Sequence, residues 1–346
     1  MDESDGTSRA KRSTIREVAS DARVSVATVS KVLRNAYGVS DAVRARVEES
    51  IQRLSYRPLA AARAMRGRSY TLGVILSDIR NPFFADVLEG VQAGLADTPY
   101  QPLVGLSHSE AVVESSVVES MIDRQIDGLV FVAPHLMRAQ LEDMAARVPM
   151  VVFGHHLPEV EALDTVNNDD RLGAELAVQH LVGTGRSRIL MLSSNRLTYE
   201  DFQHQAVTGQ RELGYREAMA AAGLADHVRI ERVPRDSAGI RAVVRDVLTS
   251  DDRPEAIFCW TDFVALEVIG VARELGLSIP HDIAVVGYDN SSSCSLPQNS
   301  LTSVNQFGRM LGEHCVRLLL QRIEGQRRPV HYVISPQLVV RRSTAG

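Results

Sequence analysis

Residues 14–33 read TIREVASDARVSVATVSKVL, and this stretch decides the fold of the N-terminal part of the chain. Thr14 and Glu17 have the spacing of a capping box, in which the threonine hydroxyl accepts from the amide three residues later and the glutamate returns to the capping amide. A helix is therefore predicted from residue 15 to about residue 22. Ser25 can cap a second helix that reads VATVSKVL. Two short helices joined by a turn of about three residues have the size of a helix-turn-helix unit.

The second helix is predicted to have an apolar face and an outward face. Val29 and Val32 recur at helical spacing and are expected to pack on the first helix. The side chains left facing outward could enter a DNA major groove; they are Val26, Ala27, Ser30 and Lys31. A third helix is predicted after Ser40, with one face formed by Val43, Val47, Ile51 and Leu54. A three-helix bundle with no role in DNA binding is the alternative that this pattern leaves open.

Positive charge is concentrated at the N-terminal end of the chain. Residues 1–70 hold 14 Lys and Arg against 8 Asp and Glu, whereas the remainder holds 24 against 35. A basic module on an acidic body is typical of a protein that binds a polyanion with one part and senses something else with another. Chance clustering of charge on a solvated face is the alternative.

The N-terminal region resembles the headpiece of the lactose-repressor (LacI/GalR) family of transcription regulators. The resemblance covers residues 14–33 together with VSDAVRARV at 39–47 and LSYRP at 54–58. It implies that Val26, Ala27 and Lys31 read bases. It also implies phosphate contacts from Thr14, Ser25, Thr28 and Ser30. Lys31 has the strongest donor of the base readers, and a charged donor prefers the O6 and N7 acceptors of guanine. Arg34 stands where the family usually has Asn and could supply a phosphate contact of its own.

Residues 58–69 are predicted to form a hinge. Pro58 can begin a helix, and LAAARAMRG offers helix formers up to Gly67, but a run of about nine residues is too short to be helical alone in water. The resemblance implies that two such helices pair on DNA, with contacts from Arg63 and Met65. Met65 stands where the family usually has Leu and would wedge into the minor groove. A plain Ala-rich linker is the alternative.

Short apolar runs rich in β-formers alternate with helical stretches from Tyr70 onward. The alternation predicts parallel sheets with right-handed crossovers, and the series is too long for one sheet. The predicted strands are 71–76, 102–106, 127–132, 150–154, 188–192, 256–260 and 282–288. A helix over 305–323 is expected to cross back to the first lobe. The expected fold is thus an all-α helix-turn-helix headpiece followed by a two-lobed α/β core with doubly wound parallel sheets.

The domain boundaries follow from these elements. We expect a disordered tail at 1–12, the helix-turn-helix domain at 13–57, the hinge at 58–69 and the core at 70–346. Within the core, the first lobe is expected at about 70–165 plus 293–325. The second lobe is expected at about 166–292 plus 326–346.

The core also resembles that of the LacI/GalR family, which is similar to periplasmic sugar-binding proteins. NPFFADVLEGVQ (81–92), VNNDDRLGAELAVQHLVGTG (166–185) and PEAIFCWTDFVALEVIG (254–270) stand in the expected order. In open α/β sheets, ligands meet the loops that leave the carboxyl ends of strands. Sugars are bound by Asp and Arg at their hydroxyls and by aromatic rings at their apolar faces. The resemblance places effector contacts at Asn81, Phe84, His155, Asn195, Arg211, Trp260 and Asp289.

For four of these residues a structural role is the alternative. Arg211 and Asp289 could instead form a structural salt bridge or cap. His155 could be an ordinary surface histidine. Trp260 could be a core indole unrelated to ligand.

The resemblance implies a repressor that binds a pseudo-palindromic operator as a homodimer and responds to a sugar or sugar derivative. A purine or nucleoside effector is the alternative. A sugar-binding transport protein would share the core, but MDESDGTSRAKR lacks the apolar segment of a signal peptide, so a cytoplasmic, nucleoid-associated protein with no membrane contact is expected. No Leu heptads follow LVVRRSTAG, which favours a dimer over a tetramer.

An enzyme is not expected. The glycine-rich stretch Gly183-Thr184-Gly185 follows a predicted helix and precedes a strand, the reverse of a dinucleotide-binding turn. No P-loop and no nucleophile elbow is present. Three cysteines are too few and too scattered for a tetrahedral metal site, so neither a cofactor nor a metal is expected.

Overall fold

The computed structural model describes residues 13–33, 36–56, 67–108, 110–157, 160–194 and 206–345. The chain separates into two compact units, one up to Ser69 and one from Tyr70 onward. The predicted tail, most of the predicted hinge, and the predicted contact residues Arg34, Arg63, Met65 and Asn195 lie outside the described residues. No helix in the described ranges is long and apolar enough to cross a membrane.

The N-terminal unit contains the predicted helix-turn-helix, formed by α1 (Ile15–Asp21), α2 (Val26–Leu33) and α3 (Asp41–Arg53). The capping box is confirmed, since the Thr14 amide donates to Glu17 Oε2 at 2.6 Å and the Glu17 amide donates to Thr14 Oγ1 at 3.3 Å. Ser25 caps α2 as predicted, because the Thr28 amide donates to its hydroxyl at 3.1 Å. Local hydrogen bonds thus begin both helices at the predicted residues.

A small core holds the three helices together. Val18, Val29 and Val47 are fully buried, one from each helix. Asp21 ties α1 to α3, because Ser50 Oγ donates to its Oδ2 at 2.5 Å and Arg53 donates to the same oxygen at 2.6 Å. These two bonds lower the pKa of Asp21 below its ordinary value. The orientation of α2 is therefore set by its buried valines, and its opposite face is left exposed.

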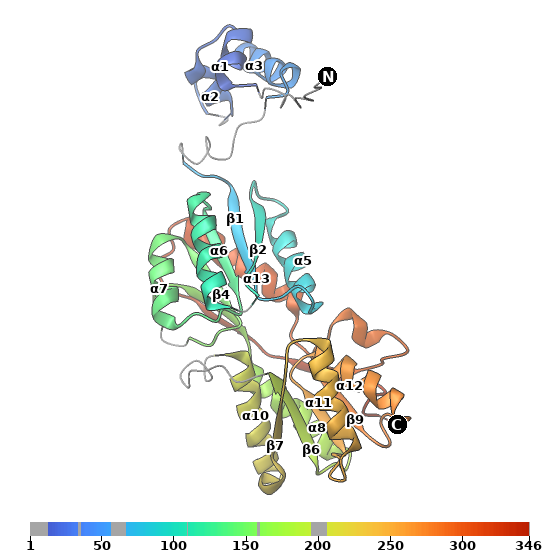
Figure 1. Ribbon diagram of the computed structural model, residues 1–346. Coiled ribbons are helices and arrows are strands. Elements are labelled where there is room, and N and C mark those ends of the chain that lie inside the picture. The colour runs from blue at the N-terminus through green and yellow to red at the C-terminus, as the bar shows by residue number, and fades with distance from the viewer. Residues whose placement is uncertain are drawn as a thin grey trace, which may run out of the picture. The chain divides into compact units, whose positions relative to one another are not determined.

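The second unit is built on two six-stranded sheets (Figure 1), as the two doubly wound lobes predicted. The first sheet has the order β11-β5-β4-β3-β1-β2, and its strands are β1 (Thr71–Leu76), β2 (Gln101–Leu106), β3 (Gly128–Val132), β4 (Met150–Phe153), β5 (Asp164–Asn168) and β11 (His331–Ile334). The second has the order β12-β10-β9-β8-β6-β7, and its strands are β6 (Ile189–Ser194), β7 (Arg229–Val233), β8 (Ala256–Cys259), β9 (Ala284–Asp289), β10 (Thr302–Asn305) and β12 (Gln337–Val339). Neighbouring strands are parallel except β10 and β12.

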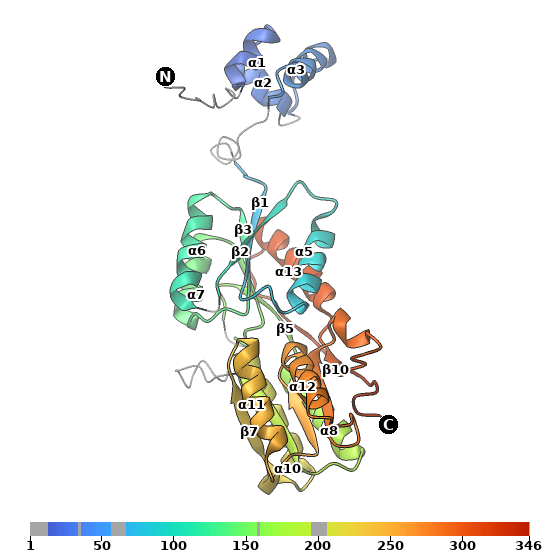
Figure 2. The ribbon, with the colours of Figure 1, turned by 45° about the vertical axis from the view of Figure 1, so that its right-hand side comes forward.

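Helices cover both faces of each sheet (Figure 2). In the first lobe, α5 and α13 contribute to one core and α6 and α7 to the other; these helices are α5 (Phe83–Leu95), α6 (Ala111–Asp123), α7 (Arg138–Arg147) and α13 (Gly308–Ile323). In the second lobe, α11 and α12 cover one face and α8 and α10 the other; these are α8 (Asp170–Gly183), α10 (Val207–Ala221), α11 (Ser237–Thr249) and α12 (Asp262–Glu274). Because both faces are covered, β3 and β4 can be apolar throughout, which is why they were predicted.

Helix α13 crosses back to the first lobe, as predicted for residues 305–323, although it begins at Gly308. It lies against α5 at close range because both helices have a glycine at the contact. A Cβ atom on Gly312 would lie 2.1 Å from the Val87 carbonyl oxygen, and one on Gly90 would lie 2.0 Å from the Arg309 carbonyl oxygen. The backbones could not approach so closely with larger residues.

Several strands and two parts of the predicted lobe boundaries differ from the sequence-based expectation. The strands β5, β7, β10, β11 and β12 were not predicted. The segment 293–325 was assigned to the first lobe, but β10 lies in the second sheet; the segment 326–346 was assigned to the second lobe, but β11 lies in the first sheet. The chain therefore passes between the sheets after β5, after β10 and after β11.

Strand β5 was missed because its buried residues are polar. Its sequence is DTVNN, and all of its residues are buried. Arg322 donates to both carboxylate oxygens of Asp164, at 2.8 and 3.0 Å, and the Asn168 side chain donates to the Gln306 carbonyl at 3.3 Å. Polar groups are tolerated in a core when they are hydrogen-bonded in this way. Their partners are distant in sequence, so the apolar pattern gives no sign of the strand.

Candidate ligand-binding site

A cavity of about 160 Å³ lies where loops from both lobes meet. It is lined by residues that follow β1, β3 and β4 in the first lobe and β7, β8 and β10 in the second, together with the last residue of β9 and the start of α10. These are carboxyl ends of parallel strands, where open α/β sheets bind ligands. A single water needs ~10–15 Å³ in the same measure, so the cavity has room for a small molecule.

The structure brings most of the predicted effector contacts to this cavity. Its lining includes Asn81, Phe84, Arg211, Trp260 and Asp289. They come from four separate segments of the chain, and the first two belong to a different lobe from the other three. The loops after the strands therefore converge as the sheet topology predicts.

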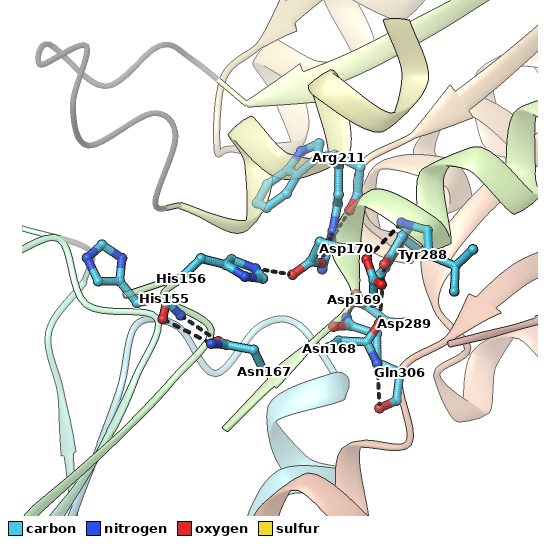
Figure 3. A network of polar contacts seen from close by, with 12 residues as sticks. His155, His156, Asn167, Asn168, Asp169, Asp170, Arg211, Tyr288, Asp289 and Gln306 are labelled. Atoms are coloured by element: carbon cyan, nitrogen blue, oxygen red, sulfur yellow. Dashed lines mark hydrogen bonds and ion pairs between the residues drawn. The ribbon is translucent and has the colours of Figure 1, made fainter. Parts of the chain in front are cut away.

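Asp289 forms the polar centre of the site (Figure 3). Its Oδ2 accepts from Asn81 Nδ2 at 2.9 Å, which joins the two lobes, and its Oδ1 accepts from Gln306 Nε2 at 2.5 Å. Its φ is +120°, a left-handed conformation that is strained for a non-glycine residue and is often found at functional sites. Burial, followed by the Asp262 carboxyl, raises the pKa of Asp289 to about 8, although Arg211 and the two amides act in the other direction.

Arg211 links the cavity to a buried ion pair. Its Nε donates to Asp170 Oδ1 at 2.8 Å, its Nη1 donates to the Trp260 carbonyl at 2.5 Å, and its guanidinium lies 3.6 Å from the centre of the Tyr288 ring. His156 Nε2 contacts the other oxygen of Asp170 at 2.9 Å (Figure 3). Arg211 thus forms the structural ion pair considered from sequence and also lines the cavity.

Aromatic side chains form apolar walls of the cavity. Phe84 and Trp260 are half-buried, and Phe83 lies beside Phe84 with ring centres 5.8 Å apart. Trp260 also packs against the cores on both faces of the second sheet, and its Nε1 is buried without an acceptor in the described part of the chain. Rings in these positions can cover the C–H face of a sugar while polar groups bind its hydroxyls.

His155 is not among the residues that line the cavity, and its role as an effector contact stays a prediction. Its side chain is fully buried, and its backbone is fixed by Asn167, whose Oδ1 accepts from the His155 amide at 3.0 Å and whose Nδ2 donates to its carbonyl at 3.1 Å. It is therefore not a surface histidine either. Figure 3 shows its ring directed away from the Asp170 network, which His156 joins instead.

Sequence reasoning missed several cavity residues, notably Arg80, His135, Arg235 and Gln306. Arg80 lies in the loop that follows the predicted strand 71–76. His135 follows the predicted strand 127–132, so the rule of carboxyl-end loops could have found it. Arg235 follows β7, and Gln306 follows β10, two strands whose polar residues concealed them.

The N-terminal unit presents the predicted DNA-contact face on α2. Val26 is 38% exposed although it is apolar, and Ala27 and Lys31 are exposed beside it. Thr14 is exposed at the start of α1, whereas Thr28 and Ser30 are half-buried. The Ser25 and Thr28 hydroxyls lie 2.9 Å apart at the start of α2. The exposed end of a second helix is the part of a helix-turn-helix that enters a major groove.

Comparisons with known proteins identify both parts of the chain. Residues 14–58 match the model for bacterial regulatory proteins of the lacI family, and residues 178–344 match a periplasmic binding protein-like domain. The HTH-type transcriptional repressor PurR of Erwinia tasmaniensis is 30% identical over 339 residues, which cover 96% of this chain and 97% of that protein.

Two solved structures are similar over nearly the whole chain. The transcriptional regulator CelR in complex with cellobiose is 29% identical with a TM-score of 0.69, covering 96% of this chain and 100% of the other. The Lac repressor dimer bound to operator and the anti-inducer ONPF has a TM-score of 0.83 at 23% identity, covering 97% and 100%. The second likeness is one of fold.

Proposed function

The chain belongs to the lacI family of bacterial regulatory proteins, and we propose that it is a repressor whose operator affinity is controlled by a sugar or sugar derivative bound between its lobes. It is a DNA-binding transcription regulator with a helix-turn-helix headpiece. We further propose that it acts as a homodimer on a pseudo-palindromic operator, in the cytoplasm at the nucleoid, and not as an enzyme. Two-fold symmetry of the protein would then match the symmetry of its site.

The α2 helix carries the DNA part of this proposal. Val26, Ala27 and Lys31 are exposed side by side, and the buried valines behind them fix the helix in the headpiece. Lys31 supplies a charged donor for guanine, and the two apolar residues can contact thymine methyl groups. The hydroxyl residues at the starts of α1 and α2 would contact phosphates on either side.

Lys31→Ala should cost about 1–3 kcal/mol of affinity at one base pair per half-site and relax the base preference there, because the variant loses its base-edge donor. Arg34→Ala, as a phosphate contact, should weaken binding to all sequences alike. Selection of each variant against a randomised operator pool measures both effects. If Lys31→Ala keeps the base preference of the parent, Lys31 does not read a base.

The cavity carries the effector part of the proposal. Its single most telling feature is the bond between Asn81 and Asp289, because it places polar groups from both lobes at one point, next to the half-buried rings of Phe84 and Trp260. A sugar that binds both groups and both rings would favour one arrangement of the lobes. Coupling to DNA binding then follows if that arrangement differs from the one the operator selects, with a size of about 1–3 kcal/mol. We propose that ligand lowers operator affinity.

Trp260 offers a direct test, since it is the sole tryptophan of the chain. The effector should change its emission saturably, and the same ligand concentration should release the operator, because one binding event controls both. A screen of sugars by thermal shift identifies the compound, since a bound ligand raises stability by mass action. A nucleoside that changed both signals, with no sugar doing so, would contradict the sugar assignment while leaving the regulator intact.

A further inference from the structure

Arg235 differs from the other arginines that line the cavity. Arg80 forms an ion pair with Asp78 at 2.6 Å, and Arg211 forms one with Asp170 at 2.8 Å. Arg235 forms no ion pair with a carboxylate in the ranges that the structure describes. Two of the lining guanidinium groups are therefore neutralised by the protein, and the third is not.

The bonds of Arg235 reach across to the first lobe. Its Nη1 donates to the His108 carbonyl at 3.2 Å, and its Nη2 lies 3.2 Å from His135 Nε2. Arginine can only donate, so His135 Nε2 accepts, and the hydrogen of the ring is on Nδ1. That nitrogen lies 3.3 Å from Glu114 Oε1. Both partners of Arg235 are thus neutral groups on the opposite lobe.

The nearby carboxylates have other partners. Glu114 is fully buried, and its Oε2 accepts from the His135 amide at 2.7 Å, so it holds the histidine rather than the arginine. Asp78 is bound by Arg80 through Nε and Nη2. The pKa of Arg235 is lowered, first by burial and then by repulsion from Arg80. The carboxylates of Asp78, Glu110 and Glu114 act in the opposite direction, at longer range. The group nevertheless stays cationic, as guanidinium groups do in proteins.

The remaining acid of the cavity does not balance this charge. Asp289 is buried, its two oxygens accept from Asn81 and Gln306, and its charge acts on Arg211 rather than on Arg235. Among the described residues that line the cavity, Arg235 is therefore the arginine with no carboxylate bound directly to it, since Glu114 reaches it only through His135. Arg235 also retains three of its five N–H groups without an acceptor in the described chain.

We infer that the effector is a sugar bearing a phosphate or carboxylate group, and that Arg235 binds this group from the second lobe. The inference rests on the proposed function, in which a sugar derivative occupies this cavity. A planar guanidinium with free donors matches the geometry of an oxyanion. Because Arg235 already bridges to His108 and His135, an anion held there would contact both lobes and favour their association. A neutral sugar or a nucleoside would leave the free donors of Arg235 without an anionic partner.

The test compares charged sugars with their neutral parents on the whole chain. Pentose and hexose phosphates, the matching sugar acids and the unmodified sugars are titrated against Trp260 emission, and melting temperatures provide a second readout. At least one charged compound should bind about tenfold or more tightly than its neutral parent. Comparing the affinities of the sugar phosphates with those of the sugar acids shows which oxyanion the site prefers.

Variants of Arg235 then assign the preference to this residue. Arg235→Gln should reduce the preference for the charged compound over its neutral parent to near unity, measured as the ratio of the two affinities in the same variant, whereas Arg235→Lys should keep part of the preference. Arg245→Gln is the matched control, since Arg245 is exposed on α11 and pairs with Glu274 at 2.7 Å, outside the cavity lining. It should bind as the parent does. Unliganded melting temperatures check that the variants are folded.

The outcomes separate this inference from the proposed function. If neutral sugars bind as tightly as charged ones, or if no charged sugar binds, the inference is wrong. If the preference exists but survives in Arg235→Gln, the anion is bound elsewhere and the assignment is overturned. A neutral sugar that binds and releases the operator would keep the proposed function in either case, whereas an effector that is not a sugar would remove both this inference and the sugar assignment and leave the DNA-binding regulator intact.

Discussion

The Arg211→Met variant is expected to be less stable than the parent by about 3–5 kcal/mol, because it leaves a buried carboxylate without its guanidinium partner. The side chains of Arg211 and Asp170 are 3% and 1% exposed. Burial alone would raise the pKa of Asp170, but Arg211 and His156 hold it below its ordinary value. The carboxylate therefore stays charged inside the protein. Urea unfolding without ligand measures the loss in the free energy of unfolding.

Arg147→Met is the matched control for this prediction. Arg147 binds both carboxylate oxygens of Glu119, at 2.5 and 2.6 Å, but the two side chains are 41% and 47% exposed. Exposed pairs contribute little to stability, so a much smaller loss is expected. The double variant Asp170→Leu/Arg211→Met should regain part of the loss, because it removes the unpaired charge. Equal losses in Arg211→Met and Arg147→Met would contradict the prediction.

The headpiece could be predicted in detail because its signals are local. The capping residues Thr14 and Ser25 lie within three residues of the amides they bind, and the alternation of buried and exposed residues on α2 follows the helical period. The apolar strands of the core could also be predicted, since a strand covered on both faces usually forms a continuous apolar run.

Elements that depend on distant partners could not be predicted. Asp164 in β5 is buried only because Arg322 reaches it from α13, 158 residues later in the chain. Which of two neighbouring histidines joins the Asp170 network also depends on distant residues. His155 and His156 are equivalent in sequence, yet Asn167 fixes the backbone of the first and Asp170 binds the ring of the second. The position of Arg235 in the cavity likewise depends on the fold and not on its own neighbours.

Asp289 should make the folded protein less stable as pH rises from about 4 to about 8. Aspartate has a reference pKa of 3.8, whereas burial and the Asp262 carboxyl raise that of Asp289 to about 8 in the folded protein. Between these values the folded state holds a proton that the unfolded chain has released. Each unit rise in pH then lowers the free energy of unfolding by up to about 1.4 kcal/mol. The stabilisation is complete below the lower pKa and is lost as pH rises through the upper one.

Asp289→Asn isolates this contribution, because its amide is uncharged and has nearly the shape of the protonated acid. Asp262 is also buried with a raised pKa, so both carboxyls contribute to the pH dependence of the parent's free energy of unfolding. The contribution of Asp289 is therefore the difference between the parent and the variant. Urea unfolding at several values between pH 5 and 8 should give a flatter dependence for Asp289→Asn than for the parent. Asp226→Asn, at an exposed position, should keep the parent slope. Parallel curves for the parent and Asp289→Asn would mean that Asp289 is ionised in the folded state, where its charge would act on Arg211.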